Sequence, residues 1–155
     1  MSFKVFLKQA KYRVWQFFKA VNPRLDNQAW DYAYKKADAS LQPLLSKLGK
    51  AEKAHTLRVL NLIESDTSLG NNERQELLDF ALIHDIGKAI TKPTLVFKVA
   101  KILFKLNGNA HCIAGAKAVW HLTHNKQLAL RILHHHLKSD VEPFITKFQK
   151  YDDRA

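Results

Sequence analysis

The segment His84-Asp85-Ile86-Gly87-Lys88 places a histidine and an aspartate at the end of an apolar helical stretch. Glycine is common just after the last turn of a helix, so Gly87 predicts the end of a helix, with His84 and Asp85 in its last turn. Burying an imidazole and a carboxylate costs free energy unless a positive charge lies between them. A bound metal ion satisfies both side chains, and an ion pair at the helix end is the alternative.

On both sides of this segment, apolar residues recur at spacings of three and four, and runs of β-branched residues are scarce. Only five glycines and four prolines interrupt the 155 residues. The sequence therefore predicts an all-α fold, a single compact helical bundle. The expected helices cover residues 3–21, 27–36, 39–48, 50–64, 72–87, 94–106, 110–123, 125–137 and 141–151.

The length suits one domain that buries a hydrophobic core without disulfides or a structural metal. We expect residues 50–155 to form this core and residues 1–49 to be a helical extension packed on it. Charged residues interrupt every apolar run before the roughly 18 residues of a transmembrane helix, and the N-terminus lacks the pattern of a secretory signal. Cys112, the single cysteine, cannot form an internal disulfide. These features predict a cytoplasmic protein.

The net charge of +11 and the pI near 9.8 favour anionic partners. The chain has no recognisable nucleic-acid-binding motif, so nucleic acid is not expected. Residues 1–21 form a basic amphipathic pattern that suits an anionic membrane surface, although packing on the core with the lysines in water is the preferred interpretation. A solvated basic surface without a polymeric partner explains the charge equally well. The oligomeric state is not indicated.

Four residues far apart in the sequence have side chains that bind divalent metal ions: His55, His84, Asp85 and Asp152. Adjacent residues of a regular helix project about 100° apart, so His84 and Asp85 can hold one ion only near a helix end. Asp153 is the alternative to Asp152 as the distant carboxylate.

The order of these residues resembles the HD-domain superfamily of metal-dependent phosphohydrolases, in particular small stand-alone bacterial HD proteins with an HDIG-type motif. The resemblance covers residues 50–155. It rests on three segments: Glu52-Lys53-Ala54-His55-Thr56-Leu57-Arg58-Val59, Leu82-Ile83-His84-Asp85-Ile86-Gly87-Lys88 and Phe148-Gln149-Lys150-Tyr151-Asp152-Asp153. It implies an HD-type helical bundle in which His55, His84, Asp85 and Asp152 bind a metal ion.

Two further segments resemble the histidine-rich second half found in part of this superfamily. Residues 111–116, which begin His111-Cys112, resemble a His-Pro-x-x-Gly-Ala motif with cysteine in place of proline. Residues 132–136, which end His135-His136, resemble an Ile-Leu-x-His-His motif. The resemblance implies that these three histidines bind a second metal ion bridged by Asp85, or contact a substrate phosphate. The Gly-Tyr-Pro motif of cyclic-dinucleotide phosphodiesterases is absent, which disfavours cleavage of cyclic di-GMP.

The expected function is metal-dependent hydrolysis of a small phosphorylated substrate, a nucleotide or another phosphate ester, by a metal-activated water. Asp85 is expected to orient or deprotonate this water, and Lys88 to contact the phosphate, unless it is a solvated lysine. Arg58 either binds phosphate or pairs with Asp85 or Glu52. The ligand types admit manganese, iron, nickel, cobalt, zinc or magnesium, as one ion or two. The alternatives are a non-catalytic module that binds a nucleotide or a partner, and a basic adaptor on membranes or nucleic acid.

Overall fold

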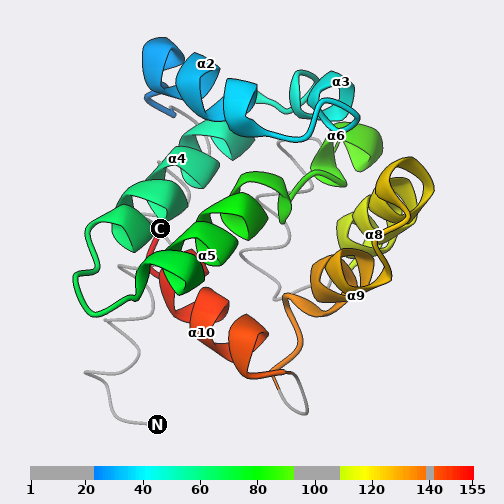
Figure 1. Cartoon of the computed structure of the whole chain (residues 1–155). Helices are drawn as coiled ribbons and strands as arrows, with labels where there is room; N and C mark the ends of the chain where they lie inside the picture. The colour runs from blue at the N-terminus through cyan, green and yellow to red at the C-terminus, as the bar shows by residue number, and fades with distance from the viewer. Residues whose placement is uncertain (1–22, 93–108, 139–141) are drawn as a thin grey trace, which may run out of the picture.

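The computed structural model describes residues 23–92, 109–138 and 142–155 (Figure 1). The regular structure in these ranges is entirely helical, which confirms the all-α fold. The helices are α2 (Asn27–Lys36), α3 (Gln42–Leu45), α4 (Lys50–Glu64), α5 (Asn71–Ile83), α6 (Lys88–Thr91), α8 (Ala110–Thr123), α9 (Lys126–His134) and α10 (Pro143–Asp152). The helices expected at 3–21 and 94–106, and with them the membrane-facing pattern of residues 1–21, lie outside the described residues. No helix in the described ranges has the length and apolar character that crossing a membrane requires.

Most of the described helices agree with the sequence prediction, and α2, α4 and α8 have the predicted bounds. The helix expected over residues 39–48 is reduced to α3, because Pro43 lies in its first turn. A proline is tolerated in the first turn of a helix but disrupts its interior. Helix α2 packs against α4, and α3 packs against α6. The described part of residues 1–49 therefore lies against the helices that follow it.

The segment that ends α5 differs from the prediction. Helix α5 ends at Ile83, and the chain makes tight turns before α6 begins at Lys88. In these turns the N–H of Ile86 donates to the carbonyl of Ile83, and that of Lys88 donates to the carbonyl of Asp85. The prediction that Gly87 caps the end of this helix is wrong, because α5 ends four residues earlier and Gly87, with a φ of −64°, precedes α6. These turns bring His84 Nε2 to 3.4 Å from Asp85 Oδ2, which the 100° spacing of a regular helix disfavours.

The core lies where α4, α5 and α10 meet. Phe80 of α5 packs edge to face on Phe144 and Phe148 of α10, with ring centroids 5.3 and 4.7 Å apart. Ile63 of α4 is completely buried in the same cluster. The ring of Phe148 also lies 5.1 Å from that of His84, centroid to centroid. The aromatic core therefore supports one wall of the region in which His84 lies.

Helices α8 and α9 form a helical hairpin beside α6 (Figure 1). Helix α8 ends where His124 adopts a left-handed conformation with a φ of 54°. The side chain of Asn125 then caps α9 by accepting a hydrogen bond from the N–H of Leu128. This hairpin places the first turn of α8 and the last turn of α9 next to the segment 84–88.

Candidate metal centre

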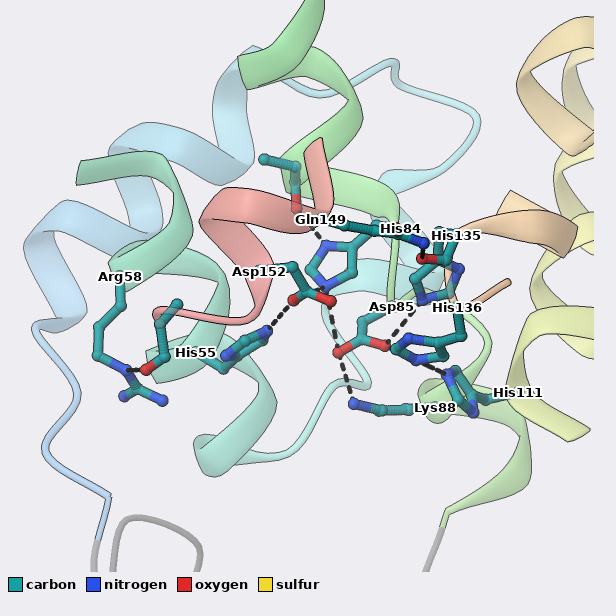
Figure 2. A network of polar contacts seen from close by, with 12 residues as sticks. His55, Arg58, His84, Asp85, Lys88, His111, His135, His136, Gln149 and Asp152 are labelled. Carbon is teal, nitrogen blue, oxygen red and sulfur yellow. Dashed lines mark hydrogen bonds and ion pairs between the residues drawn. The ribbon is translucent and has the colours of Figure 1, made fainter. Parts of the chain in front are cut away.

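Three helices bring His55, His84 and Asp152 together, although they are separated by up to 97 residues (Figure 2). The Nε2 atom of His55, on α4, lies 2.8 Å from Asp152 Oδ1 at the end of α10. His84 Nε2 lies 3.5 Å from the same oxygen. One potential ligand atom of each residue lies within 4.8 Å of the other two. We call these three residues the first group.

A second group consists of His111 and Cys112 at the start of α8 and His135 and His136 at the end of α9. Their potential ligand atoms also all lie within 4.8 Å of one another. His111 Nε2 is 3.1 Å from His136 Nε2 and 3.5 Å from Cys112 Sγ. His135 is completely buried, whereas His136 is exposed.

Asp85 lies between the two groups (Figure 2). Its Oδ2 atom is 3.4 Å from His84 Nε2 and 2.5 Å from Lys88 Nζ. Its Oδ1 atom is 3.5 Å from His111 Nε2 and 3.9 Å from His135 Nε2. The side chain is only 2% exposed. Each carboxylate oxygen of Asp85 therefore faces one group, which is the arrangement a bridging ligand needs.

Backbone carbonyls fix the orientation of two imidazoles. His84 Nδ1 lies 2.8 Å from the carbonyl oxygen of Ala81, and His135 Nδ1 lies 2.6 Å from that of Ile132. Because a carbonyl only accepts, each Nδ1 carries the hydrogen, and in the neutral ring Nε2 has the free lone pair. Metal-binding histidines are commonly oriented by such a hydrogen bond from the other ring nitrogen.

Three buried atoms in this region have no hydrogen-bond partner among the described residues: His84 Nε2, Asp85 Oδ1 and His135 Nε2. A buried polar atom without a partner loses its hydration without compensation. All three belong to side-chain types that bind divalent ions, the imidazoles through an unprotonated nitrogen, and His135 Nε2 lies 3.9 Å from Asp85 Oδ1. The residues present therefore fit a divalent metal ion.

The electrostatics of the centre differ between its two histidine groups. Burial lowers the pKa of His84, but the carboxylates of Asp85 and Asp152 outweigh burial and raise this pKa to about 10. Burial raises the pKa of Asp85, but the Lys88 ammonium and His84 hold it well below its usual value. Burial, together with the positive charge of His84, lowers the pKa of His135 to about 4. At neutral pH the carboxylates are thus ionised and the lone pair of His135 is unprotonated.

A close backbone approach positions the second group against Asp85. A Cβ atom added to Gly87 would overlap the backbone carbonyl of His111 and lie 2.6 Å from the backbone nitrogen of Gly115. A Cβ on Gly115 would lie 3.1 Å from the nitrogen of Gly87. Glycine at both positions therefore lets the first turn of α8 approach the turn after Asp85.

The structure brings the four residues predicted for the first metal into one centre with His111, His135, His136 and Lys88. It places Asp152 there, whereas its neighbour Asp153 is exposed. The Nε of Arg58 donates a hydrogen bond of 2.7 Å to the backbone oxygen of Ala155 (Figure 2). Its predicted contact with phosphate stays a prediction.

Sequence reasoning missed two residues of this region. Cys112 was interpreted only as a replacement for proline, yet its sulfur belongs to the second group. The side chain of Gln149 donates hydrogen bonds to the carbonyls of His135 and Leu137, and so holds the end of α9 against α10. The available signal in the sequence was spacing: Gln149 precedes Asp152 by three residues on one helix, so the two side chains lie on the same face.

Comparisons of the chain with protein-family models, with curated proteins and with solved structures found no match. The resemblance to HD-domain proteins therefore rests on the sequence motifs alone.

Proposed function

We propose that this protein is a metal-dependent phosphohydrolase that acts on a small phosphorylated substrate. The observation that carries the proposal is the convergence of His55, His84 and Asp152 beside the buried carboxylate of Asp85. An ion at the first group would be held by His55, His84, Asp152 and Asp85. When bound, a divalent ion supplies Lewis acidity, which lowers the pKa of water and polarises a phosphoryl oxygen.

Asp85 is suited to orient a water molecule rather than to deprotonate it. Its carboxylate is held by Lys88, and its pKa lies well below the usual value, so it is a weak base but a permanent hydrogen-bond acceptor. The accepted hydrogen bond fixes the direction of the water's lone pair toward the phosphorus atom. The role of Asp85 in the proposed reaction is therefore positional.

Lys88 is suited to contact the phosphate. Its side chain is 26% exposed, and its ammonium group lies directly beside the buried Asp85. Burial lowers the pKa of Lys88, but Asp85 outweighs burial and raises it, so the group stays positive at neutral pH. A positive group at this place stabilises the charge that grows on phosphoryl oxygens during displacement.

Part of the centre is exposed. His84 and Asp85 are 1% and 2% exposed, whereas the neighbouring side chains of His55 and Lys88 are 23% and 26% exposed, so the site opens to solvent beside them. The net charge of +11 favours an anionic substrate.

The test is release of phosphate from a panel of nucleotides and simple phosphate esters by protein loaded with manganese, cobalt, zinc or magnesium. The variants Asp152→Asn and His84→Ala should reduce turnover at least about 100-fold, since each removes a ligand. The matched controls are Asp153→Asn, which changes the exposed neighbour, and His121→Ala, which changes an exposed histidine of α8.

Metal-dependent hydrolysis that is lost in the first two variants and kept in the controls supports the proposal. Stoichiometric binding of a nucleotide without phosphate release would instead support the non-catalytic module. Equal turnover in Asp152→Asn and Asp153→Asn would overturn the site assignment.

A further inference from the structure

Cys112 is a potential ligand that the proposed hydrolase centre does not use. It is the single cysteine of the chain, its side chain is completely buried, and it lies in the first turn of α8. Its sulfur atom lies within 4.8 Å of ring nitrogens of His111, His135 and His136. Three imidazoles and one thiol thus come from two helices to one place.

Two of the separations among these atoms are close to those of ligands around one tetrahedral ion. With zinc bond lengths of about 2.3 Å to sulfur and about 2.05 Å to nitrogen, tetrahedral geometry separates nitrogen from sulfur by about 3.5 Å and two nitrogens by about 3.3 Å. Cys112 Sγ lies 3.5 Å from His111 Nε2, and His111 Nε2 lies 3.1 Å from His136 Nε2. These atoms need little movement to share one ion.

An independent observation comes from His135. Its Nε2 atom is buried and lacks a hydrogen-bond partner among the described residues, while its Nδ1 is engaged by the carbonyl of Ile132. Gln149 holds the carbonyl of His135 itself, so the residue is fixed from both sides. The lone pair of a completely buried imidazole is thereby aimed into the group that contains the thiol.

We propose that Cys112 is a thiolate ligand at the second metal site that the resemblance implies for His111, His135 and His136, and that this site therefore prefers a borderline transition ion such as zinc or cobalt. Binding transfers the thiol proton to solvent, and the sulfur lone pair forms the metal bond. Sulfur ligands favour such ions over magnesium, which takes oxygen ligands. This site extends the proposed function through Asp85, which faces both groups, but metal binding here is measured without reference to hydrolysis.

The experiment is a titration of metal-free full-length protein with Co²⁺, followed by absorption in the near ultraviolet. Thiolate-bound cobalt gives a charge-transfer band, and Cys112 is the single residue of the chain that can supply a thiolate. We expect a band that saturates by two equivalents per chain, because the first group also takes cobalt, and by one equivalent where the first group is removed. Zn²⁺ should remove the band by displacing cobalt, whereas a large excess of Mg²⁺ should leave it unchanged.

Two variants locate the band. Cys112→Ser should lose it, and His135→Ala should raise the cobalt concentration for half saturation at least about tenfold, because even a partner outside the ligand shell changes metal affinity about 10–100-fold. His55→Ala, which changes the first group alone, is the matched control and should keep the band.

Bound cobalt without a thiolate band in the wild-type protein would overturn the proposal, and this result does not depend on how any variant folds. A band that Mg²⁺ removes would overturn the stated preference. If the band is present but phosphate esters are not hydrolysed, the second site stands and the proposed function fails. If phosphate esters are hydrolysed but the band is absent, the proposed function stands and the second site fails.

Discussion

Replacing Gly87 with alanine should destabilise the protein, because the glycine allows α8 to lie against the turn after Asp85. The added Cβ would overlap the carbonyl of His111 and lie 2.6 Å from the nitrogen of Gly115. Both neighbours are backbone atoms, so a change of side-chain rotamer cannot relieve the overlap. The first turn of α8 must move away, which weakens its packing on α6.

Overpacking of this kind costs about 1–3 kcal/mol. In a chain of this size each kcal/mol lowers the melting temperature by about 2–4 °C, so the expected decrease is about 2–12 °C. The conformation of Gly87 is ordinary for any residue, with a φ of −64°, so the loss comes from sterics and not from backbone strain.

The assay is thermal unfolding followed by circular dichroism at 222 nm, together with urea unfolding at fixed temperature. Gly70→Ala is the matched control, because a Cβ there meets nothing within 4 Å. The free energy of unfolding of Gly70→Ala should change by less than about 1 kcal/mol. Alanine is a weaker N-cap of α5 than glycine, but it also makes the unfolded chain less flexible, and the two effects offset each other. A melting temperature of Gly87→Ala within 1 °C of the wild type would refute the close-approach argument.

Three further outcomes are expected from the same structure. Adding Zn²⁺ at about 100 times its dissociation constant should stabilise the native state by about 2.7 kcal/mol. Calorimetry should show that this stabilisation is reduced in Asp152→Asn, kept in Asp153→Asn and reversed by a chelator. Tyr151→Phe should raise the pKa of Asp66, which is held at about 2 by hydrogen bonds from Ser68 and from the Tyr151 hydroxyl. A carboxyl pKa that is lower in the folded than in the unfolded state stabilises the fold at pH values above the unfolded pKa, and this stabilisation is lost as pH falls through the folded pKa. The stability of the variant should therefore differ from that of the wild type above about pH 4 and converge with it toward pH 2. NMR titration of the Asp66 side chain tests this, and an unchanged pKa of Asp66 would contradict it. Phe148→Ala should cost about 3–5 kcal/mol in chemical denaturation, because Phe148 is completely buried in the aromatic core, and a loss below about 1 kcal/mol would contradict that packing.

Local pattern predicted the helices well wherever local interactions govern the backbone. Apolar spacing set the bounds of α2, α4 and α8 as the structure has them. The short helix α6 and the turns before it were not predicted, because contacts between α6, α3 and α8 decide the path of the chain there. Gly87 was correctly singled out, but the reason was wrong, since its function depends on a helix 24 or more residues later in the chain.

The candidate centre was predicted in part. The residue types of His55, His84, Asp85 and Asp152 identified them as ligands, because imidazole and carboxylate chemistry is visible in the sequence. The choice between Asp152 and Asp153 could not be derived from sequence alone, since neighbouring residues differ only in the direction that the helix gives them. The structure places Asp152 2.8 Å from His55 and leaves Asp153 exposed.

By itself, the sequence determined that the chain is helical and which side chains have lone pairs to offer a cation, because periodicity and residue chemistry are local properties. Only the tertiary structure decided that Cys112 joins three histidines, that Asp85 faces both groups and that Arg58 donates to the backbone of Ala155. These relations depend on how α4, α8, α9 and α10 pack around the segment 84–88. Distances between residues far apart in the chain are fixed by packing, and no local pattern encodes them.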